Sequence, residues 1–444
     1  MLDPLSLAIA GALFAAAPPP SIPVKEHRLA NGLTLLLSED HRLPVVAVEV
    51  RYLVGSGHER AGRTGFAHLF EHLMFQGSEH HDREYFAPFE PIGADVNGTT
   101  SQDRTNYYEQ VPSNFLGLAL WMESDRMGGL LPVLTQAKLD NQRDVVKNER
   151  RQRYENTPYG GFSLRASAEL FPPGHPYHHT PIGSHEDLGA AALDDVSGFF
   201  RQYYVPSNAV VTLVGDFDPA VARAEVERYF GGLPAGKRAP SPAAPLPRRT
   251  DSRHVTETDD VKLPRVHLAW VTPALFSQGD AELDLLASLL TEGKTSRLYQ
   301  PLVFEQRVAS DVAAYQASMK LGSYFVVQAT AAPGKSVDEL ARALTAALGT
   351  SLATPPTDAE FGRALNRYRK DFFERAESVL DRTTTLSTYW HVAGTADWFA
   401  QDLARYTSAT PARVHEQARA WIRPEAAVRI DIVPETARPT KEAP

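Results

Sequence analysis

The sequence predicts an α+β fold of two homologous domains, each a largely antiparallel sheet covered by helices. Three observations predict this fold class. Strands rich in Val and Leu are mixed with helices that often come in pairs, an order typical of helices layered on an antiparallel sheet. The segment 236–250, GKRAPSPAAPLPRRT, contains four prolines and has the composition of a stiff, solvated linker. Beyond it, the order of strands and helices repeats.

The first domain is predicted over residues 24–235. It begins with strands at 33–37 and 45–54, which are rich in Val and Leu. A helix is expected over 64–77, TGFAHLFEHLMFQG, with Thr64 capping its start and Gly77 ending it. The other predicted elements are a helical stretch at 82–89, a polar strand pair at 94–100 and 104–111, helices at 114–127, 134–156, 162–170, 194–204 and 219–230, and a buried strand at 210–214.

The second domain is predicted over residues 251–438 and repeats this order. The segment 282–291, ELDLLASLLT, stands where the helix 64–77 stood, but its apolar face carries leucines in place of histidines. We therefore expect a metal site only in the first domain; a single large domain is the alternative. The other predicted elements are strands at 266–272, 308–315, 324–329 and 428–433, and helices at 336–349, 358–377 and 410–421.

Composition excludes several functional classes. The chain has 444 residues, 43% of them hydrophobic, and a formal net charge of −9, values ordinary for a globular protein of two or more domains. The negative charge predicts no affinity for nucleic acid or for an anionic membrane. The absence of cysteine excludes disulfides and thiolate–zinc sites.

Residues 1–23 are predicted to be a leader segment with a proline spacer. The apolar run 5–17 is 13 residues long, which is too short to span a bilayer but suits the core of a signal peptide. This favours a periplasmic protein without a membrane span. Two features oppose it, because the first residues carry Asp3 and no basic residue, and proline follows the alanines. The alternative is an apolar tail on a cytoplasmic protein.

The segment HLFEH contains His68, Glu71 and His72. On a helix, positions i, i+3 and i+4 share one face, so these three side chains point at a common place. Two imidazoles one turn apart can hold zinc, and the glutamate can act on a water molecule at the metal. The motif is HxxEH, the inverzincin signature. The alternative is an exposed polar face with two solvated histidines, and a catalytic zinc would need a third ligand from elsewhere.

Several ordered segments of the chain resemble one family. Glu149 lies 77 residues after His72, within NERRQ and shortly before NTPYG. The segments 29–59, 93–112, 175–188 and 203–219 match the same pattern, so the chain resembles the insulinase/pitrilysin family of metallopeptidases. The resemblance implies that Glu149 is the third zinc ligand. Its proportions resemble the subfamily of two-domain subunits that includes the mitochondrial processing peptidase and its bacterial relatives.

The resemblance also implies an activity, zinc-dependent hydrolysis of short or unfolded peptides. Glu71 would take a proton from water and deliver it to the leaving amine. The strand 94–100, with Asn97, Gly98 and Thr99, would pair with an extended substrate as an added strand; an ordinary core strand is the alternative. One departure is Gln142, which stands where the family usually has a second glutamate.

A second departure concerns the substrate clamp. Active members of the family carry an arginine and a tyrosine seven residues apart in the second domain, and the matching positions here are Val303 and Ser310. Arg382 and Tyr389 have the right spacing but lie in a segment expected to be helical. The resemblance thus predicts a heterodimer with a homologous subunit that keeps the pair. The alternatives are a non-catalytic structural subunit and a peptide-binding protein without turnover.

The segment HPYHH holds a second group of histidines, His175, His178 and His179. A metal cluster is conceivable there. The three side chains cluster around prolines in a loop, and the family resemblance implies that HPY recurs there without binding metal, so we expect them to be solvated instead.

Overall fold

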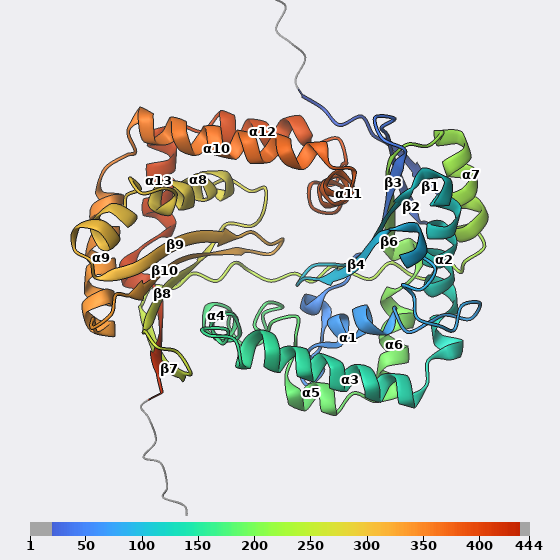
Figure 1. Ribbon diagram of the computed structural model, residues 1–444, viewed down its shortest axis with the longest axis horizontal. Helices are drawn as coiled ribbons and strands as arrows, with labels where there is room; N and C mark the ends of the chain where they lie inside the picture. The colour runs from blue at the N-terminus through green and yellow to red at the C-terminus, as the bar shows by residue number, and fades with distance from the viewer. Residues whose placement is uncertain (1–19, 436–444) are drawn as a thin grey trace, which may run out of the picture.

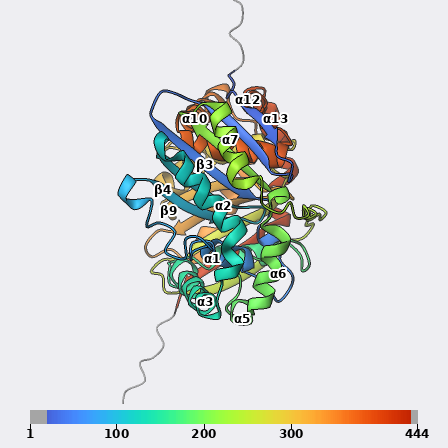
Figure 2. The same cartoon turned by 90° about the vertical axis from the view of Figure 1, so that its right-hand side faces the viewer.

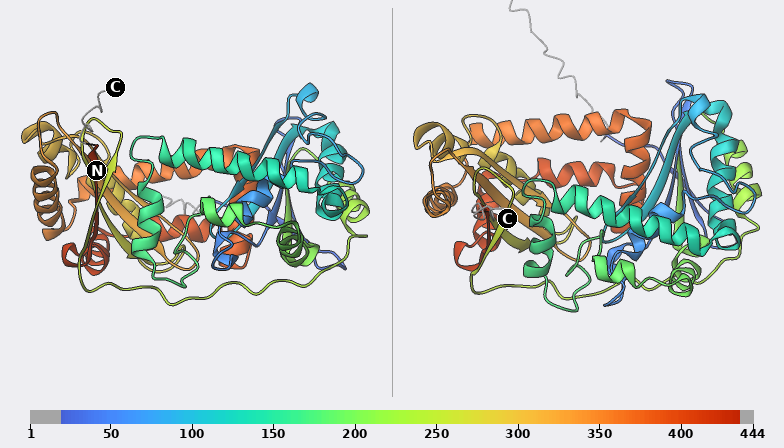
Figure 3. Two further views of the ribbon diagram at one scale, coloured as in Figure 1. Left: turned by 90° about the horizontal axis from the view of Figure 1, so that it is seen from below. Right: turned by 60° about the horizontal axis from the view of Figure 1, so that its bottom comes forward.

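The computed structural model describes residues 20–435, so the apolar run 5–17 lies outside the described residues. Two β-sheets lie side by side, the first formed by strands between Lys25 and Gly215 and the second by strands between Arg253 and Pro434 (Figure 1). The segment 236–250 between them contains neither helix nor strand and passes from one half to the other as an extended stretch (Figure 3). The domain boundaries given above stay predictions.

The first sheet has six strands in the order β1-β2-β6-β3-β5-β4. Only the β2–β6 pair is parallel. β4 is an edge strand, with one side paired to β5. The strands are β1 (Lys25–Arg28), β2 (Thr34–Glu39), β3 (Val45–Tyr52), β4 (Asp95–Thr100), β5 (Thr105–Pro112) and β6 (Ala209–Gly215).

The second sheet has five strands in the order β7-β11-β8-β10-β9, with only β11 and β7 parallel. The predicted α+β class, with largely antiparallel sheets covered by helices, is confirmed. The strands are β7 (Arg253–Asp259), β8 (Arg265–Thr272), β9 (Ala309–Ala317), β10 (Ser323–Ala331) and β11 (Val428–Pro434).

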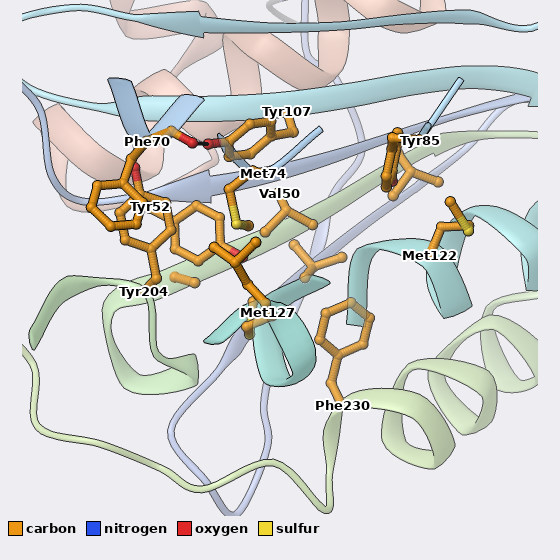
Figure 4. Close-up of a cluster of buried hydrophobic side chains, with 14 of the residues drawn as sticks. Val50, Tyr52, Phe70, Met74, Tyr85, Tyr107, Met122, Met127, Tyr204 and Phe230 are labelled. Atoms are coloured by element: carbon orange, nitrogen blue, oxygen red, sulfur yellow. Dashed lines mark hydrogen bonds between the residues drawn. The ribbon is translucent and has the colours of Figure 1, made fainter. Parts of the chain in front are cut away.

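Helices cover the outer face of the first sheet. Figure 2 shows α2 (Leu116–Val133) and α7 (Pro219–Phe230) on the side of the sheet that faces away from the second half. The helix α1 (Phe66–Leu73) packs on β4 and β5. The core between α1, α2 and the sheet combines aromatic rings with aliphatic and methionine side chains, and the hydroxyl of Tyr107 donates to the carbonyl of Phe70 at 3.4 Å (Figure 4). This buried core fixes α1 against the sheet.

The other helices of the first half are α3 (Gln136–Arg150), α5 (His185–Gly189) and α6 (Leu193–Tyr203). Those of the second half are α8 (Asp280–Thr291), α9 (Val337–Ala353), α10 (Asp358–Glu377), α12 (Phe399–Thr407) and α13 (Pro411–Trp421). None of the helices within residues 20–435 is long and apolar enough to cross a membrane.

Each half also contributes a helix to the sheet of the other half. α11 (Val379–Thr388), from the second half, packs on β3 and β6 and buries Leu386 in the same cluster as Leu36 and Val210. α4 (Phe162–Leu170), from the first half, packs on β8 and β11. The ring of Phe162 stacks on that of His267 at a centroid distance of 4.0 Å. The two halves are therefore held together by exchanged core helices as well as by the chain.

The structure corrects the predicted bounds of the motif helix. α1 begins at Phe66, not at Thr64, and ends at Leu73. Gly65 precedes it with φ 90, a left-handed conformation that suits glycine. Thr64 does not cap the helix, since its hydroxyl donates to Asp187 at 2.5 Å. Glu59 replaces it, because its carboxylate accepts the N–H groups of Gly65 at 2.9 Å and Ala67 at 2.7 Å.

Other predicted elements also differ from the structure. The stretch 82–89 forms turns instead of a helix, because Pro88 disfavours helical geometry at the residue before it. The predicted helix 134–156 is α3 followed by a wider π-helical turn, Arg151–Glu155. β1, β7, α5 and α12 have no predicted counterpart, whereas α11 lies in the segment around Arg382 that was expected to be helical. α11, VLDRTTTLST, is rich in threonine, a weak helix former, so its helix depends on the tertiary contacts of Leu386.

Candidate metal centre and active site

α1 presents His68, Glu71 and His72 toward one cavity of about 560 Å³. The opposite face of the helix is apolar, and Phe66, Leu69, Phe70 and Leu73 are all buried. Burial of this face fixes the rotation of the helix about its axis. The same pattern that produces the amphipathic helix therefore aims the three polar side chains at the cavity.

The third candidate ligand reaches the cavity from α3, which packs on α1. The Oε2 atom of Glu149 lies 3.5 Å from Nε2 of His68 and 3.1 Å from Nε2 of His72. The three residues are the one group among residues 20–435 whose ligand atoms, all within 4.8 Å of one another, could hold a metal. Two ligand atoms bound to zinc at ~2.0–2.1 Å in a tetrahedron lie about 3.3 Å apart. The donor set and its spacing therefore fit zinc.

The electrostatics of the three side chains agree with this fit. Burial, together with the charge of His72, lowers the pKa of His68 to about 4, so its ring is neutral at pH 7, the form that binds metals. Burial acts to raise the pKa of Glu149, but the hydrogen bond from His72 and nearby positive charges, including that of Arg153, lower it overall. Glu149 is therefore an anion beside a neutral imidazole.

The side chain of Glu71 extends from α1 toward the edge strand β4. Burial raises its pKa, an effect partly opposed by a hydrogen bond from Thr100, whose hydroxyl donates to Oε2 at 2.6 Å. A Cβ atom on Gly98 would lie 3.1 Å from Cγ of Glu71 and 3.1 Å from the ring of Phe75. Glycine at this position leaves room for the glutamate, and Thr100 orients its carboxylate. The sequence had pointed to Gly98 but gave no role to Thr100.

The predicted substrate strand does lie beside the candidate metal centre. Asn97, Gly98 and Thr99 line the same cavity as the two histidines, and β4 has an open edge. The side-chain oxygen of Asn97 accepts the N–H of Gly98 at 2.8 Å. Gln142 is buried and also lines this cavity.

The histidines of HPYHH are more buried than expected. His175 is 6% exposed, and Nδ1 of His178 lies 2.7 Å from the carbonyl of Phe171. His179 lies 2.8 Å from the carboxylate of Glu59, the group that caps α1. This loop therefore supports the start of the motif helix. This role depends on the contact between His179 and Glu59, which are 120 residues apart in the sequence. No local pattern could have indicated it.

Arg382 and Tyr389, which have the spacing of the family's substrate clamp, make other contacts in the structure. Arg382 is buried and paired with Asp40, and the hydroxyl of Tyr389 donates to Asp402 at 2.8 Å. Ser310 is exposed at the second residue of β9. None of these side chains lines the cavity that holds His68 and His72.

Comparison with known proteins connects this geometry with one family. Residues 34–160 match the family described as insulinase (peptidase family M16), and residues 191–368 match the peptidase M16 inactive domain. The zinc protease PqqE of Helicobacter pylori is 31% identical over 368 residues, which cover 81% of this chain and 82% of that protein. The chain belongs to the insulinase family, peptidase family M16.

Other proteins that are similar to this M16 protein agree with the assignment. A probable mitochondrial-processing peptidase subunit beta from Schizosaccharomyces pombe is 25% identical over 259 residues, 56% of each chain. The crystal structure of a protease from Helicobacter pylori superposes with a TM-score of 0.87 at 27% identity, covering 94% of this chain and all of that one. The predicted family and its two-domain fold are confirmed.

Proposed function

We propose that this M16 protein is a zinc-dependent endopeptidase subunit that hydrolyses short or unfolded peptides. The observation that carries the proposal is that the ligand atoms of His68, His72 and Glu149 lie within 4.8 Å of one another. Glu71 lines the same cavity and accepts a hydrogen bond from the edge strand β4. The names of relatives as zinc proteases support the same chemistry.

In the proposed mechanism, His68, His72 and Glu149 hold the metal. Zinc bound there supplies a Lewis acid that makes water acidic and polarises a peptide carbonyl. The carboxylate of Glu71 accepts a proton from the attacking water and later donates it to the leaving amine nitrogen. Thr100 holds that carboxylate in place through its hydroxyl. An extended peptide pairs with the open edge of β4 near Asn97 to Thr99, as an added strand.

A double comparison of variants tests these roles. We expect Glu71→Gln to retain stoichiometric zinc and to lose peptide hydrolysis, because an amide cannot accept the proton. Glu149→Ala should lose both, since a ligand is missing. Elemental analysis of the purified protein and a quenched-peptide assay measure the two properties. The exposed Glu84 offers a matched control, because Glu84→Gln should change neither.

Two outcomes would contradict the proposal. Tight zinc and full activity in Glu149→Ala would show that the third ligand is another residue. Peptide binding by the wild-type chain without any hydrolysis, even with a partner subunit, would favour a peptide-binding protein without turnover.

The location of the protein is part of the proposal. The apolar run 5–17 supports export to the periplasm. Sequencing the N-terminus of protein from the native cell tests it, and a start near Pro18 to Val24 in a periplasmic fraction is expected. An intact Met1 in the cytosol would refute the predicted leader.

A further inference from the structure

Arg104 lies at the turn between β4 and β5, four residues after Thr100, and is partly buried. Its Nη1 atom donates to the carbonyl oxygen of Thr99 at 2.8 Å and also to the Thr99 hydroxyl. Within residues 20–435, Arg104 makes no ion pair, and its hydrogen bonds are the two from Nη1 to Thr99, which leaves Nε and Nη2 to donate elsewhere. An arginine fork with free donors is suited to binding a carboxylate.

The three buried arginines among residues 20–435, and the partly buried Arg405, are paired with carboxylates. These pairs are Arg51–Glu49, Arg126–Glu123, Arg382–Asp40 and Arg405–Asp280. Leaving a buried charge without a counter-ion is costly. Burial, together with the charge of Arg51, lowers the pKa of Arg104 to about 10, although the charges of Glu49, Glu71 and Asp103 act to raise it.

The carboxylates near Arg104 are occupied by other groups. Glu71 accepts from Thr100, and Glu49 accepts from Arg51 and Thr384. Asp103 accepts the hydroxyl of Tyr177 and the backbone N–H of Lys320. The free donors of Arg104 are thus available to a ligand.

The pleat of β4 decides which part of a peptide would meet Arg104. Gly98 and Thr100 face Glu71 on α1. Since successive side chains of a strand point to opposite faces, Thr99 lies on the other face, where its hydroxyl donates to Asn106 at 2.7 Å. Arg104 binds Thr99 on this second face.

In a peptide added to the edge of β4, the residue opposite Thr99 has its side chain on the same face as Thr99, with the two Cβ atoms ~5 Å apart. Its sequence neighbours point to the face of α1 and the candidate metal centre. We propose that Arg104 is a specificity-determining residue that binds an aspartate or glutamate side chain of the substrate, at the position paired with Thr99. This inference rests on the proposed function.

Peptide binding to the Glu71→Gln chain tests the proposal separately from turnover. The probes are fluorescent peptides that differ only in having Glu, Gln or Lys at one position, with each position scanned in turn. We expect one position at which Glu binds about tenfold tighter than Gln, the lower end for a hydrogen bond to a charged group. Adding Arg104→Met should remove the preference for the Glu peptide, and Arg104→Lys should keep part of it. Arg104→Glu should make the chain bind the Lys peptide more tightly instead.

The exposed Arg83 is the control, because Arg83→Met in the same background should leave the ratio unchanged. Thermal unfolding identifies any variant that is misfolded, and the Arg104→Lys and Arg104→Glu variants then carry the comparison. Suppose that the ratio of Glu-peptide to Gln-peptide affinity is the same with and without Arg104, while the wild-type chain with its homologous subunit hydrolyses peptides. That result would overturn the inference and leave the proposed function standing. Failure of the wild-type chain to hydrolyse any peptide even when it is mixed with the homologous subunit, despite charge-selective binding, would overturn the function and leave Arg104 as a binding residue.

Discussion

At the scale of single residues, the candidate general base is positioned by its neighbours on β4. The hydroxyl of Thr100 holds one carboxylate oxygen of Glu71, while Gly98 leaves space for the methylene groups. Neither interaction involves a candidate metal ligand directly. Substitutions on β4 should therefore affect proton transfer more than metal binding.

We predict that Gly98→Ala lowers the rate of peptide hydrolysis while zinc content stays near one per chain. The new methyl group would lie 3.1 Å from Cγ of Glu71, Cε2 of Phe75 and Cδ1 of Tyr107, closer than ordinary contact. Overpacking of this kind also costs about 1–3 kcal/mol of folding stability. Steady-state kinetics, zinc analysis and urea unfolding measure these effects.

Gly349 is a matched control for the same chemical change. It lies in α9, and a Cβ atom there would meet nothing within 4 Å, so Gly349→Ala should preserve activity and should not lower stability, since alanine favours a helix more than glycine does. If Gly98→Ala had wild-type kinetics, the close approach of β4 to Glu71 would have no catalytic significance.

At the scale of elements, the exchanged helices α4 and α11 connect the halves. The contact between α4 and the second sheet is centred on His267, which is 1% exposed and stacks on Phe162. Its Nδ1 atom lies 3.3 Å from the carbonyl of Ile430. Burial lowers the pKa of His267 to about 3. The folded state therefore holds this ring neutral.

We predict that this histidine makes the protein less stable in mild acid. Its pKa is about 3 in the folded state and about 6.5 when unfolded, so between these values the unfolded chain binds one more proton. Stability contributed by the neutral ring is complete above pH 6.5 and falls as the pH decreases toward 3. The loss at pH 5 is roughly 2 kcal/mol for one group, at ~1.4 kcal/mol per pH unit.

His267→Phe removes the titrating group and keeps an aromatic ring for the stack. Urea unfolding of both proteins at several pH values should therefore show a shallower loss of stability between pH 6.5 and 5 in the variant. An unchanged slope would mean that His267 is protonated in the folded state or that other groups account for the acid sensitivity.

At the scale of the whole molecule, the two halves have different roles. The first half carries the candidate metal centre. In the second half, α8 has the place in the repeat that α1 has in the first, but it buries Leu283, Leu286 and Leu290. The match of residues 191–368 to an inactive M16 domain agrees with this difference. The positions expected for the arginine and tyrosine clamp hold Val303 and Ser310.

We predict that the isolated, zinc-loaded chain hydrolyses peptides poorly and gains activity when mixed with a homologous subunit that carries the arginine–tyrosine pair. Loss of donors to the developing oxyanion costs on the order of 10²-fold or more in rate. Activity measured across a titration with that subunit, together with the mass of the complex by light scattering, checks this. Rapid turnover by the pure chain as a monomer or homodimer would refute the heterodimer.

The sequence by itself determined the family, the α+β class and the candidate centre on α1, because these depend on local spacing. HxxEH needs only the helical period to bring His68, Glu71 and His72 to one face. Glu149 could be predicted as a ligand only through the family resemblance, since one glutamate on a polar helix has no distinctive local pattern.

Tertiary structure alone decided the supports of that centre and the way the halves combine. Glu59 caps α1 from a preceding loop, and α11 is a helix although its threonines disfavour one. The pleat of β4 directs Thr100 to Glu71 on one face and Thr99 to Arg104 on the other. Some of these contacts join residues far apart in the chain, as where α11 packs on β3 and β6, and others join near neighbours, as where Glu59 binds Gly65. In both cases buried polar groups must find partners and apolar faces must be covered. Local sequence preferences do not encode such pairings.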